Sequence, residues 1–283
     1  MSAQRTLKRP TSCAGIGLHS GRKVTLSLKP AAAGSGIRFR RSDLGGLEVP
    51  AAVNHVGAIN YATGLMRDAV RVDTVEHLLA ALVSLGIDNV VVELNSPEVP
   101  IMDGSAAPFV YLIQEAGVRA LEAPRRFLKV RRPISLTRGD KRIALYPSDH
   151  FKVTYSIAFD HPLLRHQSRT IRLTGDSFVD EIAPARTFTF LKEVEMLRQN
   201  GLALGGSLDN AIVLTTDGML NETGLRFRDE FVRHKILDII GDLALLGMPI
   251  LGKVVAERSG HIMHAGLMSK LLRVRSAWDI VDM

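Results

Sequence analysis

The sequence predicts an α+β protein made of two similar two-layer α/β sandwich domains that pack on each other. Strand-like segments precede helical segments in each half, and this order of elements occurs twice. A polar stretch with a proline, at 121–126, separates the halves. The 283 residues, 46% of them hydrophobic, suffice for two cores. We therefore expect an N-terminal domain over 1–122 and a C-terminal domain over 127–283.

The first half begins with half-buried strands. Apolar residues alternate with polar ones at 24–28 and 37–39, which predicts strands with antiparallel pairing. A helix with an aspartate cap and a terminal glycine is predicted over 73–86. A strand over 89–94 and a helix over 106–116 follow.

The second half has the same order of elements, although no repeat is visible at the level of residues. The expected elements are strands near 126–136, 142–146 and 152–159, a helix over 190–200, a strand over 211–215, a helix over 230–243 and a strand over 250–257. Strands followed by helices favour α+β layers over a doubly wound parallel sheet.

Composition excludes several classes of protein. Cys13 is the only cysteine, so an intrachain disulfide is excluded and a metal site would need histidine and carboxylate ligands. The N-terminus has no apolar segment of a signal peptide, and no apolar run approaches the ~20 residues of a membrane span. We expect a cytoplasmic protein. The net charge of +7 suits an anionic partner, and without a recognisable nucleic-acid module we expect no nucleic acid.

The predicted helix over 230–243 is apolar on most of its surface but carries a polar stripe. His234, Asp238 and Asp242 are spaced four apart, so they lie along one line, with Lys235 about 100° round the helix. A buried carboxylate needs a partner. His234 and Asp238 can place a nitrogen and an oxygen on one metal ion. The alternative is a hydrogen bond between a core histidine and aspartate.

Three other histidines have less specific surroundings. Glu76 and His77 lie near the start of their helix, where Asp73 and Glu76 match a capping box and His77 packs sideways. His261 is expected in a loop after a strand, a place where a general acid or base reaches substrate, although a solvated histidine is the commoner case. His19, in a glycine-rich stretch without a helix N-terminus, is predicted to be structural.

Together these segments resemble a known family. The matching motifs are GLHSG at 17–21, TVEHL at 74–78, GIDN at 86–89, PIMDGS at 100–105, ARTF at 185–188, LGGS at 204–207, RHKILDIIGD at 233–242 and SGH at 259–261. In this order and over nearly the whole chain, they resemble the UDP-3-O-acyl-N-acetylglucosamine deacetylases, the zinc amidases of lipid A biosynthesis in Gram-negative bacteria.

The resemblance implies a zinc site between the two domains. It makes His77, His234 and Asp238 the three zinc ligands, with the fourth position open for water. Glu76 would be the general base that takes a proton from this water. Iron is the alternative metal in the cell.

The same resemblance assigns further catalytic residues. His261 would be the second acid–base residue, protonated to stabilise the oxyanion and to donate to the leaving amine, and Asp242 would orient it. Thr187 would contact the developing oxyanion through its hydroxyl, and Lys235 would bind substrate.

The substrate site is implied more loosely. Residues expected to bind substrate are Lys141, Phe159, Phe188, Gly206 and Arg258, of which Lys141 and Arg258 would contact the diphosphate and Phe159 the uracil. The segment 188–213 resembles an inserted unit with an apolar passage for the acyl chain, lined by Val194, Leu197, Ala203, Leu208 and Ala211. Ordinary solvated charges and core packing explain these residues equally well one by one.

The sequence departs from the family in two places. The loop at 60–66 lacks a cysteine that some members carry near the metal, and 262–266 differs from an asparagine-rich run. The chain ends soon after Trp278, which predicts no appended domain.

The predicted activity is removal of the N-acetyl group of UDP-3-O-(3-hydroxyacyl)-N-acetylglucosamine, which gives acetate and the free amine in the committed step of lipid A biosynthesis. Its substrate is thus a UDP-glucosamine lipid precursor, and we expect a monomer in peripheral contact with the inner membrane. The alternatives are a metal-free module that binds an acyl-nucleotide, and a zinc amidase that acts on a different N-acetyl substrate.

Overall fold

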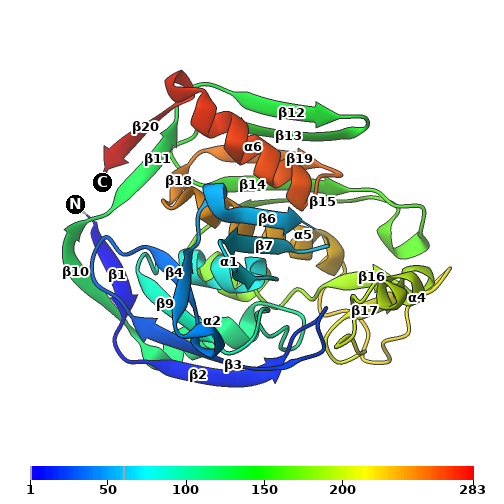
Figure 1. Ribbon diagram of the computed structural model, residues 1–283. Helices are drawn as coiled ribbons and strands as arrows, with labels where there is room; N and C mark the ends of the chain where they lie inside the picture. The colour runs from blue at the N-terminus through cyan, green and yellow to red at the C-terminus, as the bar shows by residue number, and fades with distance from the viewer. Residues whose placement is uncertain (1, 60) are drawn as a thin grey trace.

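Two five-stranded sheets enclose two layers of helices in the computed structural model, which describes residues 2–59 and 61–283 (Figure 1). Asn60, the first residue of the loop at 60–66, lies outside the described residues. The N- and C-terminal ends lie close together at one side, where β1 and β20 begin and end the chain. The mixed α+β class predicted from the sequence is confirmed.

The first sheet has the strand order β2-β3-β9-β4-β5. Its strands are β2 (Thr11–Ile16), β3 (Lys23–Pro30), β4 (Ile37–Arg41), β5 (Leu47–Pro50) and β9 (Val90–Leu94). The central strand β9 runs antiparallel to β3 and parallel to β4, and the outer pairs β2–β3 and β4–β5 are antiparallel. The alternating residues of β3 point Val24, Leu26 and Leu28 into the core.

The second sheet repeats this topology in the order β12-β13-β19-β14-β15. Its strands are β12 (Ile134–Arg138), β13 (Lys141–Tyr146), β14 (Lys152–Ile157), β15 (Gln167–Arg172) and β19 (Lys253–Glu257). Here β19 runs antiparallel to β13 and parallel to β14. The predicted repetition of element order therefore extends to strand direction.

Four helices fill the space between the sheets (Figure 1). Helices α1 (Glu76–Ser84) and α2 (Ala107–Ala116) belong to the first half, and α5 (Glu230–Leu243) and α6 (His261–Arg273) to the second. Helices α1 and α5 cross in close contact at the centre. Gly241 makes this possible, because a Cβ at that position would overlap the carbonyl oxygen of Glu76.

The remaining elements connect or extend the two halves. Outer strands form the pair β1 (Ala3–Leu7) with β10 (Val118–Pro124) and the trio β18 (Ile250–Leu251), β11 (Arg126–Val130) and β20 (Trp278–Asp282). The first half carries the small sheet β6 (Val56–Ile59), β7 (Thr63–Arg67) and β8 (Val70–Val72). The second carries α3 (Gly175–Glu181), then β16 (Phe188–Phe190), α4 (Leu191–Gln199) and β17 (Ile212–Leu214).

The strands exchange partners at Arg125, inside the stretch expected to separate the halves. Before it, β10 pairs with β1; after it, β11 pairs with β18 and β20. This change of partners supports a division near 122–127. We keep the two domains, 1–122 and 127–283, as a proposal.

Some local predictions were wrong. Helix α1 begins at Glu76, not at 73, and no side chain caps it, so the predicted capping box does not form. Asp73 pairs with Arg71 instead. The strands expected at 126–136 and 250–257 are each two shorter strands, because the chain passes from one sheet to another within them.

Candidate active site

Three buried side chains meet where α1 crosses α5. His77 projects from the first turn of α1, and His234 and Asp238 lie one turn apart on α5. The Nε2 atoms of His77 and His234 lie 3.6 and 3.3 Å from Asp238 Oδ1. Two ligands each ~2.1 Å from a tetrahedral zinc ion are roughly 3.4 Å apart. The spacing of these three atoms therefore fits one zinc ion.

The chemistry of the donors fits as well. His234 Nδ1 donates a hydrogen bond to the Ala185 carbonyl, 3.0 Å away, which leaves the Nε2 lone pair facing the cluster. Burial lowers the pKa of His234 to about 3, so the ring is neutral. Burial opposes the ionisation of Asp238, but the neighbouring His234 and Lys235 hold its pKa well below the usual value. His77 Nδ1 has no partner among the described residues.

Lys235 closes one side of the cluster. Its Nζ donates to Asp238 Oδ2 at 2.5 Å and lies 5.9 Å from the centre of the Phe188 ring. The ammonium group therefore lies between a proposed ligand and an aromatic wall of the cavity, where it can reach a bound substrate.

Glu76 lies beside the cluster and is buried. Its Oε2 accepts a hydrogen bond from the Thr63 amide at 3.1 Å, and its Oε1 is 4.0 Å from His261 Nε2. Burial raises the pKa of Glu76 to about 7. A carboxylate with this pKa can accept a proton near neutral pH.

His261 faces Glu76 from the start of α6, so it is the first residue of a helix and not a loop residue as expected. Its Nδ1 is 2.7 Å from Asp242 Oδ2. Burial alone would lower the pKa of His261, but the negative charge of Asp242 and this hydrogen bond raise it to about 9. His261 is therefore protonated when Glu76 is ionised, which suits an acid and a base in one site. Asp242 lies behind His261 and outside the three-residue cluster.

These groups open into a cavity of about 310 Å³. The predicted residues that line it are Glu76, His77, His234, Lys235, Asp238, His261, Thr187, Phe159 and Phe188. The Phe159 and Phe188 rings meet edge to face, with centres 6.2 Å apart.

A second, mainly apolar cavity of about 290 Å³ adjoins the first and shares Thr187 and Phe188 with it. Gly206 lines this cavity. So do all five residues expected in the acyl passage, which are Val194, Leu197, Ala203, Leu208 and Ala211. His19, which is predicted to be structural, lines both cavities. Its Nε2 has no partner among the described residues, and burial lowers its pKa.

A basic depression of about 550 Å³ lies on the other side of His261. Lys141 and Arg138 line it together with His261 and Tyr61. Arg258 is not among its lining residues and pairs with Asp140 at 2.6 Å. The structure thus places Lys141 in the depression that His261 also lines, whereas Arg258 contacts the residue before Lys141.

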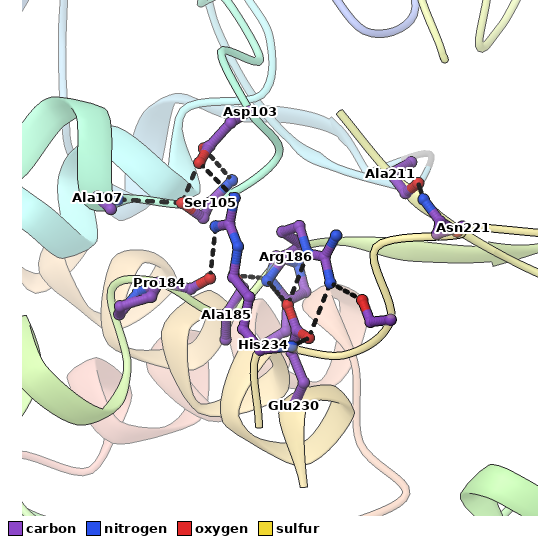
Figure 2. A network of polar contacts seen from close by, with 12 residues as sticks. Asp103, Ser105, Ala107, Pro184, Ala185, Arg186, Ala211, Asn221, Glu230 and His234 are labelled. Carbon is purple, nitrogen blue, oxygen red and sulfur yellow. Dashed lines mark hydrogen bonds and ion pairs between the residues drawn. The ribbon is translucent and has the colours of Figure 1, made fainter. Parts of the chain in front are cut away.

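A buried ion pair supports this site from behind (Figure 2). Glu230, at the start of α5, accepts hydrogen bonds from the amide and Nε of Arg186 at 3.0 and 2.9 Å. Arg186 immediately follows Ala185, whose carbonyl orients His234, and precedes Thr187. The ion pair therefore fixes both a proposed metal ligand and a proposed oxyanion contact.

Comparison with known proteins identifies the family of this chain. Residues 4–273 match the family described as UDP-3-O-acyl N-acetylglycosamine deacetylase. The chain belongs to this family. A protein of Methylococcus capsulatus named UDP-3-O-acyl-N-acetylglucosamine deacetylase is 52% identical over 285 residues, which cover 100% of this chain and 94% of the relative. One of Pseudomonas entomophila with the same name is 51% identical over 284 residues, with 99% and 94% covered.

Membership of the deacetylase family confirms the predicted recognition and enzyme class, a hydrolase acting on an amide. The family is one of metalloenzymes, and the described residues include a buried His–His–Asp cluster suited to a metal. Among the helices that the structure describes, none is long and apolar enough to cross a membrane.

Sequence reasoning missed two residues at this deacetylase site. Thr63 of β7 donates its amide to Glu76 and its hydroxyl to Asp242, at 2.6 Å. His264 contacts Asp242 from α6. The spacing of residues around Thr63 gives no signal of its role. His264 lies three residues after His261, so both lie on one face of the helix once the segment is known to be helical.

Proposed function

We propose that this protein is the zinc-dependent deacetylase of UDP-3-O-(3-hydroxyacyl)-N-acetylglucosamine in lipid A biosynthesis. The observation that carries the proposal is that three cavities adjoin one another. The apolar cavity adjoins the cavity of the His–His–Asp cluster, and this one adjoins the basic depression. They match, in order, an acyl chain, an amide and an anionic diphosphate.

The residues around the amide divide the reaction between them. Zinc, held by His77, His234 and Asp238, would supply an activated water and polarise the carbonyl. Glu76 accepts the proton of the attacking water. His261, protonated at neutral pH, stabilises the negative oxygen and donates its proton to the leaving amine.

The neighbouring side chains hold the substrate. The Thr187 hydroxyl, on the wall shared by two cavities, is proposed to donate to the developing oxyanion. Lys235 is proposed to bind substrate, and Lys141, Arg258 and Phe159 are proposed to bind its nucleotide. Phe188 and Gly206 bound the entrance to the acyl passage.

The metal content of the purified protein and the removal of one proposed ligand test this proposal. Protein purified without chelator should contain one zinc or iron per chain by elemental analysis and release acetate from the UDP-acyl substrate. His234→Ala should lose both metal and activity, since it removes one of three ligands. His166→Ala, which changes an exposed histidine away from the cavity, should keep both.

Other outcomes support the alternatives. Full acetate release without any stoichiometric metal would contradict the zinc mechanism, and no release with tight acyl-nucleotide binding would indicate a binding module. Equal turnover of simple N-acetylated amides would indicate a different substrate. Adding zinc or iron back to chelated protein identifies the more active metal.

The predicted contact with the inner membrane has a candidate surface around the acyl passage. Large apolar side chains are exposed there: Leu191, Met196, Leu204, Leu208 and Leu220. Acidic residues outnumber basic ones between 188 and 220, so attraction to anionic lipid is not expected to dominate. We propose that this apolar rim inserts into the lipid surface from which the substrate comes.

Vesicle sedimentation tests this contact. Leu204→Ser should reduce binding to neutral phosphatidylcholine vesicles severalfold, because the exposed side chain no longer inserts. Leu47→Ser is the matched control, since Leu47 is exposed to 51% and Leu204 to 53%, but Leu47 lies on β5 of the first sheet. Equal binding by both variants, or binding abolished by salt, would contradict insertion of the rim. Sedimentation velocity on the same samples tests the expected monomer.

A further inference from the structure

His264 is a buried histidine without an assigned role, one layer behind the proposed catalytic residues. It is fully buried, and its Nδ1 lies 2.6 Å from Asp242 Oδ2. His261 Nδ1 contacts the same oxygen at 2.7 Å. We propose that His264 is a positioning residue whose Nδ1–H fixes the Asp242 carboxylate and so orients His261. This inference rests on the proposed function, in which His261 donates a proton to the leaving amine.

The hydrogen-bond chemistry defines what His264 supplies. An ionised carboxylate only accepts, so both imidazoles must carry their hydrogen on Nδ1. Burial opposes ionisation of Asp242, but the charge of His261 and hydrogen bonds from His261 and His264 hold the pKa of Asp242 below its usual value. Burial lowers the pKa of His264, and its Nε2 has no partner among the described residues. His264 is thus a neutral ring with one working donor.

The lengths of these contacts argue against a cation held by Asp242, His261 and His264. Two ligands of one zinc ion would be roughly 3.4 Å apart. The two nitrogen–oxygen distances, 2.7 and 2.6 Å, are instead those of charge-assisted hydrogen bonds.

The arrangement explains why a third donor matters. Thr63 donates to Asp242 Oδ1, while His261 and His264 share Oδ2. His264 is fixed in turn, because the Tyr155 ring packs edge to face against it and the Tyr155 hydroxyl donates to the Ser259 carbonyl before α6. With Nδ1 held by Asp242, His261 Nε2 faces the cavity, 4.0 Å from Glu76 Oε1. A carboxylate free to rotate would let this ring swing away.

Three substitutions at position 264 separate the donor from the ring. In His264→Asn the amide nitrogen takes the place of Nδ1, in His264→Gln it reaches only the place of Nε2, and His264→Leu has no donor. We expect His264→Leu and His264→Gln to lower kcat about 10- to 100-fold with KM and metal content unchanged. The kcat of His264→Asn should stay within about threefold of wild type. This change is smaller than the one that the loss of a hydrogen bond causes.

The alternatives give different results. If His264→Leu keeps the wild-type kcat, or His264→Asn loses as much as His264→Leu, the donor has no positioning role. If His264→Leu does not fold, the comparison of His264→Gln with His264→Asn decides, because both are polar.

A double-mutant cycle tests whether His264 acts through Asp242. In an Asp242→Ala background, His264→Leu should cause no further loss of kcat, whereas independent roles would give multiplied losses. Proton NMR of the metal-loaded protein provides a readout that does not depend on turnover. It should show downfield imidazole N–H signals from His234, His261 and His264, and only the His264 signal should be absent in His264→Asn. Identical downfield signals in the wild type and His264→Asn would overturn the inference, whereas failure of the wild type to release acetate would overturn the proposed function only.

Discussion

Glu76→Gln should lower kcat by roughly 10²- to 10⁴-fold while the protein keeps its metal. The amide has the shape of the carboxylate, and its oxygen can still accept from the Thr63 amide, whose nitrogen lies 3.1 Å from Oε2 in the wild type. It cannot take a proton from water. Because Glu76 is not one of the three proposed ligands, elemental analysis should find wild-type metal content. Steady-state kinetics should show the loss in kcat, with KM little changed.

A matched substitution controls for the loss of a negative charge. Glu93 is a partly buried glutamate on β9 that pairs with Lys29, and it does not line the catalytic cavity. Glu93→Gln should therefore keep wild-type turnover. If Glu76→Gln retained more than about a tenth of the wild-type kcat, a general base worth 10²-fold or more would have to be another group.

Much of the fold could be predicted because it depends on local periodicity. The alternation at 24–28 marks β3, and the apolar helix at 230–243 is α5. The repeated order of elements could be recognised without repeated residues, because topology depends on the pattern of apolar positions. The breaks between β11 and β12 and between β18 and β19 could not be predicted, because each break depends on which distant strand is available for pairing.

The site was only partly predictable for the same reason. The spacing of His234 and Asp238 is local and gave their adjacency directly. Glu76 and His77 gave a misleading local signal, since their spacing favoured a capping box, which does not form. Their role depends on contact with α5, which brings residues about 160 positions apart together. His19 and Thr63 are likewise placed by the loop and strand around them, not by spacing.

The second large effect is expected for the ion pair behind the site. Glu230 is fully buried and its partner Arg186 is 7% exposed. Glu230→Leu should destabilise the protein by about 3–5 kcal/mol, because it leaves the buried guanidinium without its counter-charge. The Arg186 and Arg226 amides also lose an acceptor. Denaturant unfolding of the metal-free protein measures the change.

Two further variants identify the cause of this loss. The pair Arg186→Met with Glu230→Leu should be less destabilised than Glu230→Leu alone, because no charge remains buried. Asp279→Ala, which breaks an exposed pair with Arg131, should shift the unfolding midpoint little. If the double variant is the least stable of all, packing and not charge dominates at this position.

The ion pair also links stability to the metal site. The Ala185 carbonyl accepts from His234 Nδ1 only while Arg186 stays in place, so Glu230→Leu should weaken metal binding about 10- to 100-fold. Zinc titration of the folded variant with a competing chelator measures this. Wild-type metal affinity in a destabilised variant would contradict the link. Weaker binding in both Glu230→Leu and the double variant would instead support it, because both lose the hydrogen bonds that hold the 185–187 segment against α5.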